Sequence, residues 1–265
     1  MGDAIVITSG KGGVGKTTTT ANIGTSLALL GKKVVLVDTD IGLRNLDVVL
    51  GLDNRVIFDL VDVCHGRCKV NQALIKDKRF EGLSLLPAAQ LADKSAVNTA
   101  QMKELIEELK KDHDFVLIDC PAGIEQGFKN AVVGANKAIV VTTPDPSAVR
   151  DADRVIGLLE QEGHIDPPRL IINRIRTQML SKGETLEIDE ITNILSIELL
   201  GIVADDDEVI KAAKDREPIA LNPKNRVSIA YRNIARRLLG ESIPLQNLTE
   251  DVGVFAKVKK FFGIR

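Results

Sequence analysis

The chain has few of the residues that define several protein classes. Aromatic residues make up only 3% of its 265 residues, and it holds three cysteines, Cys64, Cys68 and Cys120. So small and odd a number of cysteines in a chain of this length argues against a disulfide framework and favours a reducing, cytosolic compartment. Hydrophobic residues at 44% and charged residues at 27% are typical of a soluble globular protein, and they exclude collagen-like, low-complexity and wholly disordered chains.

Long apolar runs and targeting signals are also missing. Pure aliphatic runs such as Val34–Val37 and Ile139–Val141 have the length of a strand, whereas a membrane-spanning helix needs about 20 apolar residues. The start from Met1 to Val6 has no basic region and no myristoylation site, and no cysteine lies near the C-terminus for prenylation. The sequence therefore predicts neither secretion nor a covalent lipid anchor.

Positive charge is concentrated at the end of the chain. Overall, 35 basic residues face 37 acidic ones, a formal charge of −2 that argues against a protein that coats nucleic acid electrostatically. The segment 254–265 differs, because it holds no acidic residue and four basic ones: Lys257, Lys259, Lys260 and Arg265. Without it, 31 basic residues face 37 acidic ones, a net charge of −6. Three of the seven phenylalanines lie in the same segment: Phe255, Phe261 and Phe262.

Short β-branched runs alternate with stretches of helical periodicity, which is the pattern of βαβ units wound into a mainly parallel sheet. We therefore expect an α/β fold, a doubly wound parallel sheet flanked by helices with right-handed crossovers. The predicted strands are Ala4–Thr8, Lys33–Val37, Leu83–Pro87, Phe115–Asp119, Ala138–Thr142, Leu170–Asn173 and, more weakly, Leu200–Val203. The predicted helices are Lys16–Leu30, Thr99–Lys111, Pro146–Glu162, Ile188–Leu195 and Val227–Leu239. We expect one domain over residues 1–240, a flexible tether over 241–253 and an amphipathic helix over 254–265.

A phosphate-binding loop follows the first predicted strand. Residues 10–17 read GKGGVGKT, which satisfies G-x-x-x-x-G-K-[ST] between a strand and a helix. Its glycines let backbone N–H groups turn toward a polyphosphate, and the following helix adds the positive end of its dipole. We expect Lys16 to meet the β- and γ-phosphates, Thr17 to ligate Mg²⁺ and Thr18 to contact phosphate. The alternative, a glycine-rich turn with a solvated lysine, is disfavoured by the complete match in this context. The candidate nucleotide ligands here are Gly10, Lys11, Gly12, Gly13, Val14, Gly15, Lys16, Thr17 and Thr18.

Carboxylates end two further predicted strands. Asp38 and Asp40 follow Val34–Val37, and Asp119 ends the predicted strand Phe115–Asp119. Ligands of an open parallel sheet lie beyond the carboxyl ends of its strands, so these carboxylates and the loop can converge in one crevice. Polyphosphate needs Mg²⁺ there, and Mg²⁺ takes oxygen ligands, so the predicted metal site is Thr17, Asp38 and Asp119. The alternative is that these aspartates merely cap or terminate strands.

Lys11, at the entry of the loop, is unusual, because a phosphate cradle needs only one lysine for its own phosphates. The run from Lys11 to Thr18 resembles the deviant P-loop of the ParA/MinD family of ATPases, which are P-loop NTPases of the SIMIBI class. The resemblance implies that the extra lysine reaches across a nucleotide-sandwich homodimer to the phosphates of the other subunit. It also implies ATP and Mg²⁺ as cofactors and slow ATP hydrolysis, with Lys11, Lys16 and Asp40 as catalytic residues and Asp40 orienting the attacking water.

Other segments resemble further parts of the same family. The run from Asp119 to Gly123, DCPAG, resembles switch II, in which Gly123 would offer a backbone N–H to the γ-phosphate and loss of that phosphate would release the loop. Asn173 matches the family's adenine-recognising position. Asp205 lies in a late loop expected to hold the adenine, where Ala204 stands at a position that is often proline.

The segment 254–265 has the pattern of a membrane-surface helix. At 100° per residue its apolar residues form one stripe and its lysines lie on the opposite arc, a distribution suited to the interface of an anionic bilayer. The alternative is a helix that docks on the protein's own core. One copy would bind weakly, whereas two copies on an ATP-bound dimer gain about 10²–10⁴-fold in avidity. The predicted membrane-binding residues are Val254, Phe255, Lys257, Val258, Lys259, Lys260, Phe261 and Phe262.

Together these segments resemble the ParA/MinD family members that select the cell-division site. That resemblance implies a location in the cytoplasm and peripherally on the cytoplasmic face of the membrane, an anionic phospholipid surface as partner, recruitment of a MinC-type division inhibitor, and a MinE-type or scaffold regulator. A DNA-partitioning ParA ATPase shares the fold but needs a basic DNA-binding face, so we expect no nucleic acid partner for a body of net charge −6. A redox iron protein needs paired cysteines at a dimer seam, and Cys64 and Cys68 lack a compact fourth ligand.

Overall fold

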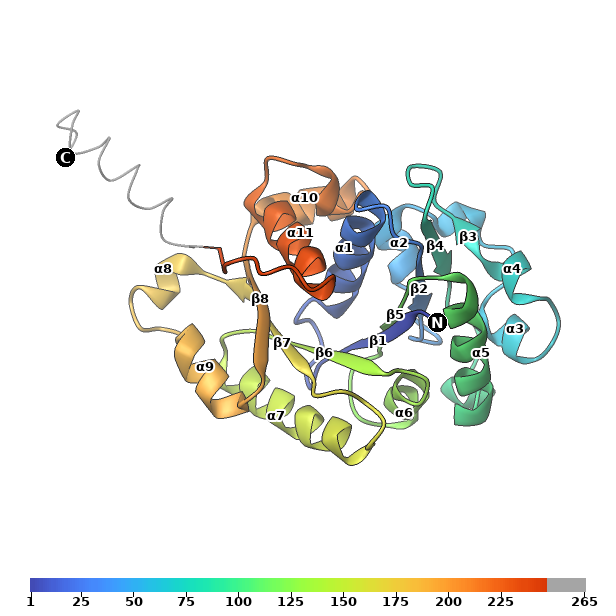
Figure 1. Ribbon diagram of the computed structural model, residues 1–265, viewed down its shortest axis with the longest axis horizontal. Coiled ribbons are helices and arrows are strands. Elements are labelled where there is room, and N and C mark those ends of the chain that lie inside the picture. Colours follow the sequence, from blue (N-terminus) through green and yellow to red (C-terminus); the bar gives the residue numbers. More distant parts are fainter. Residues whose placement is uncertain (247–265) are drawn as a thin grey trace.

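A computed structural model describes residues 1–246 of the chain, and within them one eight-stranded sheet forms the centre of the fold (Figure 1). The strands lie in the order β3-β4-β2-β5-β1-β6-β7-β8. Every pairing is parallel except that of β3 with β4. The strands are β1 (Asp3–Thr8), β2 (Val34–Asp38), β3 (Ile75–Lys76), β4 (Leu83–Leu86), β5 (Phe115–Asp119), β6 (Lys137–Thr142), β7 (Arg169–Ile175) and β8 (Glu198–Ala204).

Helices cover both faces of this sheet, which explains why its strands are aliphatic at consecutive positions. One face packs against α3, α5, α6, α7 and α9, and the other packs against α1, α2 and α11. The α-helices are α1 (Lys16–Leu29), α2 (Leu46–Leu50), α3 (Leu60–Cys64), α4 (Val70–Ala73), α5 (Thr99–Asp112), α6 (Gln126–Val132), α7 (Pro146–Gln161), α8 (Thr177–Leu180), α9 (Ile188–Leu195), α10 (Asp207–Lys214) and α11 (Arg226–Leu238). Three short 3₁₀ helices are η1 (Asp53–Arg55), η2 (Lys94–Ala96) and η3 (Ile219–Leu221).

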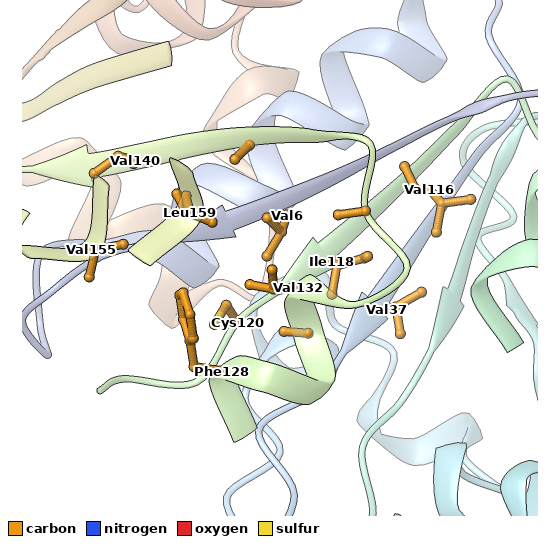
Figure 2. Close-up of a cluster of buried hydrophobic side chains, with 14 of the residues drawn as sticks. Val6, Val37, Val116, Ile118, Cys120, Phe128, Val132, Val140, Val155 and Leu159 are labelled. Carbon is orange, nitrogen blue, oxygen red and sulfur yellow. The ribbon is translucent and has the colours of Figure 1, made fainter. Parts of the chain in front are cut away.

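Figure 2 shows the apolar layer beneath α6 and α7. Val6 of β1, Ile118 of β5 and Val140 of β6 belong to one buried cluster with Phe128 of α6 and Leu159 of α7. Burying each such side chain contributes about 1.5–3 kcal/mol relative to leaving it in water. The neighbouring residues of the same strands belong to the cluster on the opposite face. The central strands are therefore held from both sides, which gives the loops at their ends a rigid base.

The predicted fold class is confirmed. The predicted strands and long helices are all present in residues 1–246, with ends within two residues of those expected. The short elements α2, α3, α4, α6 and α8 were not expected, because helices of four to seven residues show too little periodicity, and α10 was missed although it is as long as the predicted α9. The antiparallel edge strand β3 was also missed, since it is only two residues long. Each of these elements lies in a connection between the predicted ones.

The strand order sends five loops to one edge of the sheet. β1 lies between β5 and β6, and its register aligns Ile7 with Asp119. The last residues of β2 and β5, Asp38 and Asp119, are themselves register partners. Because parallel strands end on the same side, the loops after β1, β2, β5, β6 and β7 meet there. Ligands of open α/β sheets bind at such an edge, where neighbouring crossovers run in opposite directions.

The chain after α11 is described only as far as residue 246. Within residues 1–246, no helix is both long enough and apolar enough to cross a membrane. The remainder of the predicted tether 241–253 and the predicted helix 254–265 lie outside the described residues, so the domain boundaries stay a prediction. The same holds for the predicted membrane-binding residues Val254, Phe255, Lys257, Val258, Lys259, Lys260, Phe261 and Phe262.

Candidate functional site

The loop between β1 and α1 is shaped to hold an anion. Gly15 caps α1 with φ 98°, in the left-handed region that favours glycine. A Cβ at this position would overlap the side-chain amide of Asn173. No side chain caps the first turn of α1, so its backbone N–H groups, which have no partner within the helix, face the loop. Together with the helix dipole, these groups form a binding site for phosphate oxygens.

Lys16 points back into this loop rather than into solvent. The residue is only 8% exposed, and its Nζ donates to the Ser9 hydroxyl at 2.9 Å. That hydroxyl in turn donates to the carbonyl oxygen of Lys11 at 2.7 Å. The Lys16 ammonium group is therefore held on the inner side of the loop, where phosphate oxygens bound to the backbone N–H groups would meet it.

Two buried carboxylates lie side by side at the ends of β2 and β5. Asp38 and Asp119 are register partners, and the two residues are 0% and 3% exposed. The carboxylate of Asp38 accepts the backbone N–H groups of Asp40, Asn45 and Leu46 at 2.9, 3.0 and 3.1 Å. Burial raises the pKa of Asp38 to about 6, and burial together with the charge of Asp38 raises the pKa of Asp119 to about 7. A positive charge beside the pair would favour its ionised form.

The donors around this pair fit Mg²⁺. The hydroxyls of Thr17 and Thr20 hydrogen-bond Asp119, the latter at 3.0 Å. Two carboxylates and a hydroxyl are hard oxygen ligands, and Mg²⁺ usually takes one or two carboxylates and completes its shell with phosphate and water. In residues 1–246 no group of three or more His, Cys, Asp or Glu side chains could hold a metal, either at this pair or around Cys64 and Cys68, so the fit to Mg²⁺ rests on two carboxylates and a hydroxyl.

Asp40 lies at the entrance to this pair. It lines a small cavity together with Lys94 of η2, Pro121 of the loop after β5 and Gly127 of α6. Burial raises the pKa of Asp40, and the nearby ammonium groups of Lys94 and Lys16 oppose that rise. The Asp40 carboxylate is thus half-buried and faces two cations, close to the position that a terminal phosphate would occupy above Lys16.

A cleft of about 220 Å³ extends from the loop toward β7. One wall is the loop itself, and the others come from the segments that follow β6 and β7. The cleft is large enough to admit part of a nucleoside, and it is more basic than acidic because Lys11, Arg174 and Arg176 line it with Asp145. The lining residues are Lys11, Gly12, Gly13, Val14, Thr143, Pro144, Asp145, Arg174, Arg176, Met179 and Thr185.

The two residues predicted to recognise adenine are not among the described residues that line this cleft. The Nδ2 of Asn173 donates to the carbonyl oxygen of Val14 at 2.8 Å, and the residue is 5% exposed. The Oδ2 of Asp205 accepts a hydrogen bond from Nε of Arg176 at 2.7 Å. Asn173 therefore supports the phosphate loop, and Asp205 orients an arginine of the cleft wall. Their contact with a base stays a prediction.

Lys11 and Gly123 lie at the mouth of the site. Lys11 is exposed, and its Nζ donates to the hydroxyl of Ser147 in α7 at 3.0 Å. Gly123, in the loop after β5, has φ +95°. The preceding residue, Ala122, lies near the phosphate loop, since a Cβ added at Gly12 would come within 3.8 Å of its Cβ. The structure contains one chain, so the role of Lys11 toward a second subunit stays a prediction.

Residues of the cleft wall and Lys94 were missed in the sequence. Thr143, Pro144 and Asp145 directly follow β6, and Arg176 directly follows β7. The rule that ligands bind beyond the carboxyl ends of strands could have identified them, because both strands were predicted. Lys94 follows no predicted strand end, and only the folded chain brings it beside Asp40.

Comparison with known proteins finds similarity over the full length of the chain. Residues 2–162 match a family model described as an AAA domain. The septum site-determining protein MinD of Bacillus subtilis (strain 168) is 70% identical over 267 aligned positions, which cover 100% of both chains. Among solved structures, the MinC:MinD cell division protein complex of Aquifex aeolicus matches with a TM-score of 0.86 and 48% identity, over 92% of this chain and 99% of that chain. The septum site-determining protein MinD of Pyrococcus horikoshii OT3, complexed with Mg-ADP, matches with a TM-score of 0.81 and 30% identity, over 90% of this chain and 96% of that chain.

Proposed function

The chain belongs to the MinD family of septum site-determining P-loop ATPases, and on that basis we propose that it couples ATP binding to dimerisation and membrane attachment in placing the division site. The observation that carries the proposal is the convergence of Lys16, Thr17 and the buried pair Asp38 and Asp119 at one edge of the sheet. Backbone N–H groups and an ammonium group on one side, and oxygen ligands for Mg²⁺ on the other, match the parts of a metal–nucleoside triphosphate.

We assign the residues of the site different roles in ATP hydrolysis. The phosphate loop and Lys16 hold the β- and γ-phosphates and stabilise the charge that develops during phosphoryl transfer. Thr17, Asp38 and Asp119 hold Mg²⁺, which supplies charge neutralisation when bound. Asp40 orients the attacking water, and Gly123 offers its backbone N–H to the γ-phosphate. Hydrolysis without a further partner is slow, because this arrangement contributes position and charge and no strong base.

Dimerisation places the other subunit over the mouth of the site. Lys11 is exposed there, and only the Ser147 hydroxyl contacts its ammonium group among the described residues. In the ATP-bound dimer Lys11 leaves this neutral contact and reaches the phosphates bound to the other subunit. Loss of the γ-phosphate removes that attraction and frees the loop containing Gly123, so the dimer separates.

Membrane attachment follows from the dimer by avidity. The segment 254–265 combines an apolar stripe with four basic residues and no acidic one, so it suits an anionic bilayer surface. Each copy binds weakly, and joining two copies makes the second insertion intramolecular, which raises avidity about 10²–10⁴-fold. The membrane-bound dimer then recruits a MinC-type division inhibitor, as the MinC:MinD complex of Aquifex aeolicus suggests, and a MinE-type or scaffold regulator sets where this happens.

Vesicle co-sedimentation tests the proposal. The full-length chain should pellet with phosphatidylglycerol vesicles when ATP is present and much less with ADP or no nucleotide, and a chain ending at Leu248 should not pellet. Lys16→Ala, which removes the buried ammonium group, should lose the response to ATP, whereas Lys103→Ala, which removes an exposed lysine of α5, should keep it. Equal pelleting of the full-length and shortened chains would contradict the membrane function.

A further inference from the structure

A groove beside the edge strand β8 receives the end of the described chain. Leu245 lines it with Leu180 of α8, Ile188 of α9 and Ile202 of β8, and its volume is about 510 Å³. Cavities of about 300–1,000 Å³ commonly hold apolar ligands. Leu245 is 44% exposed, so the described residues leave part of its apolar surface uncovered. Figure 1 shows this end of the chain, in red, beside α8 and β8.

Arg237 of α11 leads the chain to this groove. Its guanidinium group donates to the carbonyl oxygen of Leu200 in β8 at 2.9 Å and to those of Ile243 and Pro244 at 2.9 and 2.8 Å. These bonds attach the chain after α11 to the edge of the sheet. The segment beyond Leu245 therefore starts at the groove instead of at the end of α11.

Charge and length favour one occupant, the segment 254–265 of the same chain. Glu187 and Asp189 line the groove, and none of the described residues that line it is basic. The segment 254–265 has four basic residues and no acidic one. The eight residues 246–253, which separate Leu245 from the segment, span up to about 26–29 Å when extended, so the segment can reach a groove that begins at Leu245.

We propose that the segment 254–265 docks in this groove when it is not bound to a membrane. Its phenylalanines pack against Leu180, Ile188 and Ile202, and its lysines lie at Glu187 and Asp189. The inference rests on the proposed function, because docking matters only if the same apolar stripe also binds lipid. The groove then competes with the membrane, and a single ADP-bound chain binds lipid more weakly than its segment would alone.

The groove and the nucleotide cleft share a wall, which gives the nucleotide a route to this competition. Within the segment 174–189, Arg176 and Met179 line the cleft, while Leu180 and Glu187 line the groove. A nucleotide that contacts the cleft side of this segment can therefore change the groove side. It shifts docking by the difference between its affinities for the docked and undocked forms.

A single tryptophan tests docking in the full-length protein. The chain contains no tryptophan, so Phe261→Trp provides a unique fluorophore. With ADP and no lipid, docking predicts that this fluorophore is protected from acrylamide quenching and that adding Ile188→Gln removes the protection. Ile188→Gln should also raise the affinity of the ADP-bound protein for phosphatidylglycerol vesicles about threefold to tenfold, because only undocked chains bind lipid.

A second variant covers the case in which Ile188→Gln disturbs α9. Glu187→Gln with Asp189→Asn changes two exposed side chains at the groove and should give the same result, and any docking that remains should depend less on salt than in the parent. The matched control, Asp153→Asn with Glu160→Gln, removes equal charge from exposed positions of α7 and should behave like the parent. Basal ATP hydrolysis should be unchanged in all of them.

The outcomes separate this inference from the proposed function. Equal quenching in every variant, with vesicle binding that still depends on ATP, overturns docking and leaves the proposed function in place. Vesicle binding that is absent with every nucleotide overturns the proposed function instead. Protection that rises with protein concentration, together with a dimer mass in ADP, means that a second copy fills the groove and overturns docking within one chain.

Discussion

Replacing Asp119 with asparagine should change how the stability of the nucleotide-free protein depends on pH. Burial and the charge of Asp38 raise the pKa of Asp119 from 3.8 to about 7. The folded protein therefore binds this proton more tightly than the unfolded chain does, and the free energy of unfolding falls as pH rises from about 4 to about 7. Asp38, with its pKa raised to about 6, acts in the same direction. Asp119→Asn has no proton to lose and should show a smaller fall.

The size of the effect follows from the shift. One pKa unit corresponds to about 1.4 kcal/mol, so a rise of about three units sets an upper limit on the order of 4 kcal/mol. The two carboxylates repel each other, which means that the shift belongs partly to the pair. We therefore expect the free energy of unfolding of Asp119→Asn, measured relative to that of the parent, to rise by about 2 kcal/mol between pH 4 and pH 8. For a chain of this size, this corresponds to roughly 4–8 °C in Tm.

Thermal unfolding in EDTA, followed by circular dichroism from pH 4 to pH 8, measures this difference. Asp119→Asn also accepts weaker hydrogen bonds from Thr17 and Thr20, which lowers its Tm. Because this loss is the same at every pH, it does not affect the comparison between pH values. Asp153→Asn, at an exposed position of α7, should follow the parent at every pH. Curves of Tm against pH that run parallel for the parent and Asp119→Asn would refute the reasoning. Mg²⁺ with ADP should reduce the difference in Tm between Asp119→Asn and the parent at pH 8, because a cation stabilises the ionised carboxylates of Asp38 and Asp119.

Substitutions of Asp40, Lys94 and Lys11, with two control variants, test the other groups of the site. Asp40→Ala should still bind ATP but hydrolyse it on the order of 10²-fold more slowly, and unchanged phosphate release would remove Asp40 from its role. Lys94→Ala should move the acidic limb of the kcat profile to higher pH, because Lys94 opposes the rise in the pKa of Asp40. Lys94→Arg should restore the profile, and three coincident profiles would show that this electrostatic contact is irrelevant. Lys11→Ala should remain monomeric with ATP in light scattering, whereas Ser147→Ala, which removes only the hydroxyl that Lys11 contacts within the chain, should still dimerise. A dimer of Lys11→Ala would reject the cross-subunit contact.

The parts of the site that were predicted from sequence depend on neighbours in the chain. The phosphate loop is one continuous motif between a strand and a helix. Asp38 and Asp119 each end an aliphatic run, so their convergence needed only the rule that parallel strands end on the same side. Even the burial that raises their pKa values follows from strands covered on both faces. In these cases the local pattern and the tertiary structure lead to the same arrangement.

The parts that escaped prediction depend on contacts between distant segments. Lys94 lies in a polar stretch with no periodicity, and its place beside Asp40 comes from the packing of η2 against α6. The family resemblance predicts that Asn173 recognises adenine, and that contact stays a prediction; what the sequence did not reveal is that its amide donates to the carbonyl oxygen of Val14, 159 positions away. Nothing in the sequence distinguishes Arg237 from the other charged residues near the end of its predicted helix, although in the structure it binds three carbonyl oxygens. The direction in which a side chain points is decided by partners that the local pattern does not reveal.

Avidity and docking make different predictions for a chain that cannot dimerise. If ATP acts only by bringing the segments 254–265 of two subunits together in a dimer, Lys11→Ala should bind vesicles equally weakly with ATP and with ADP. Docking acts within one chain, so adding Ile188→Gln to Lys11→Ala should raise vesicle binding in ADP about threefold to tenfold although no dimer forms. Suppose that Ile188→Gln increases binding alone but not together with Lys11→Ala. The groove would then act between chains, and the wall that it shares with the nucleotide cleft would transmit its effect across the dimer.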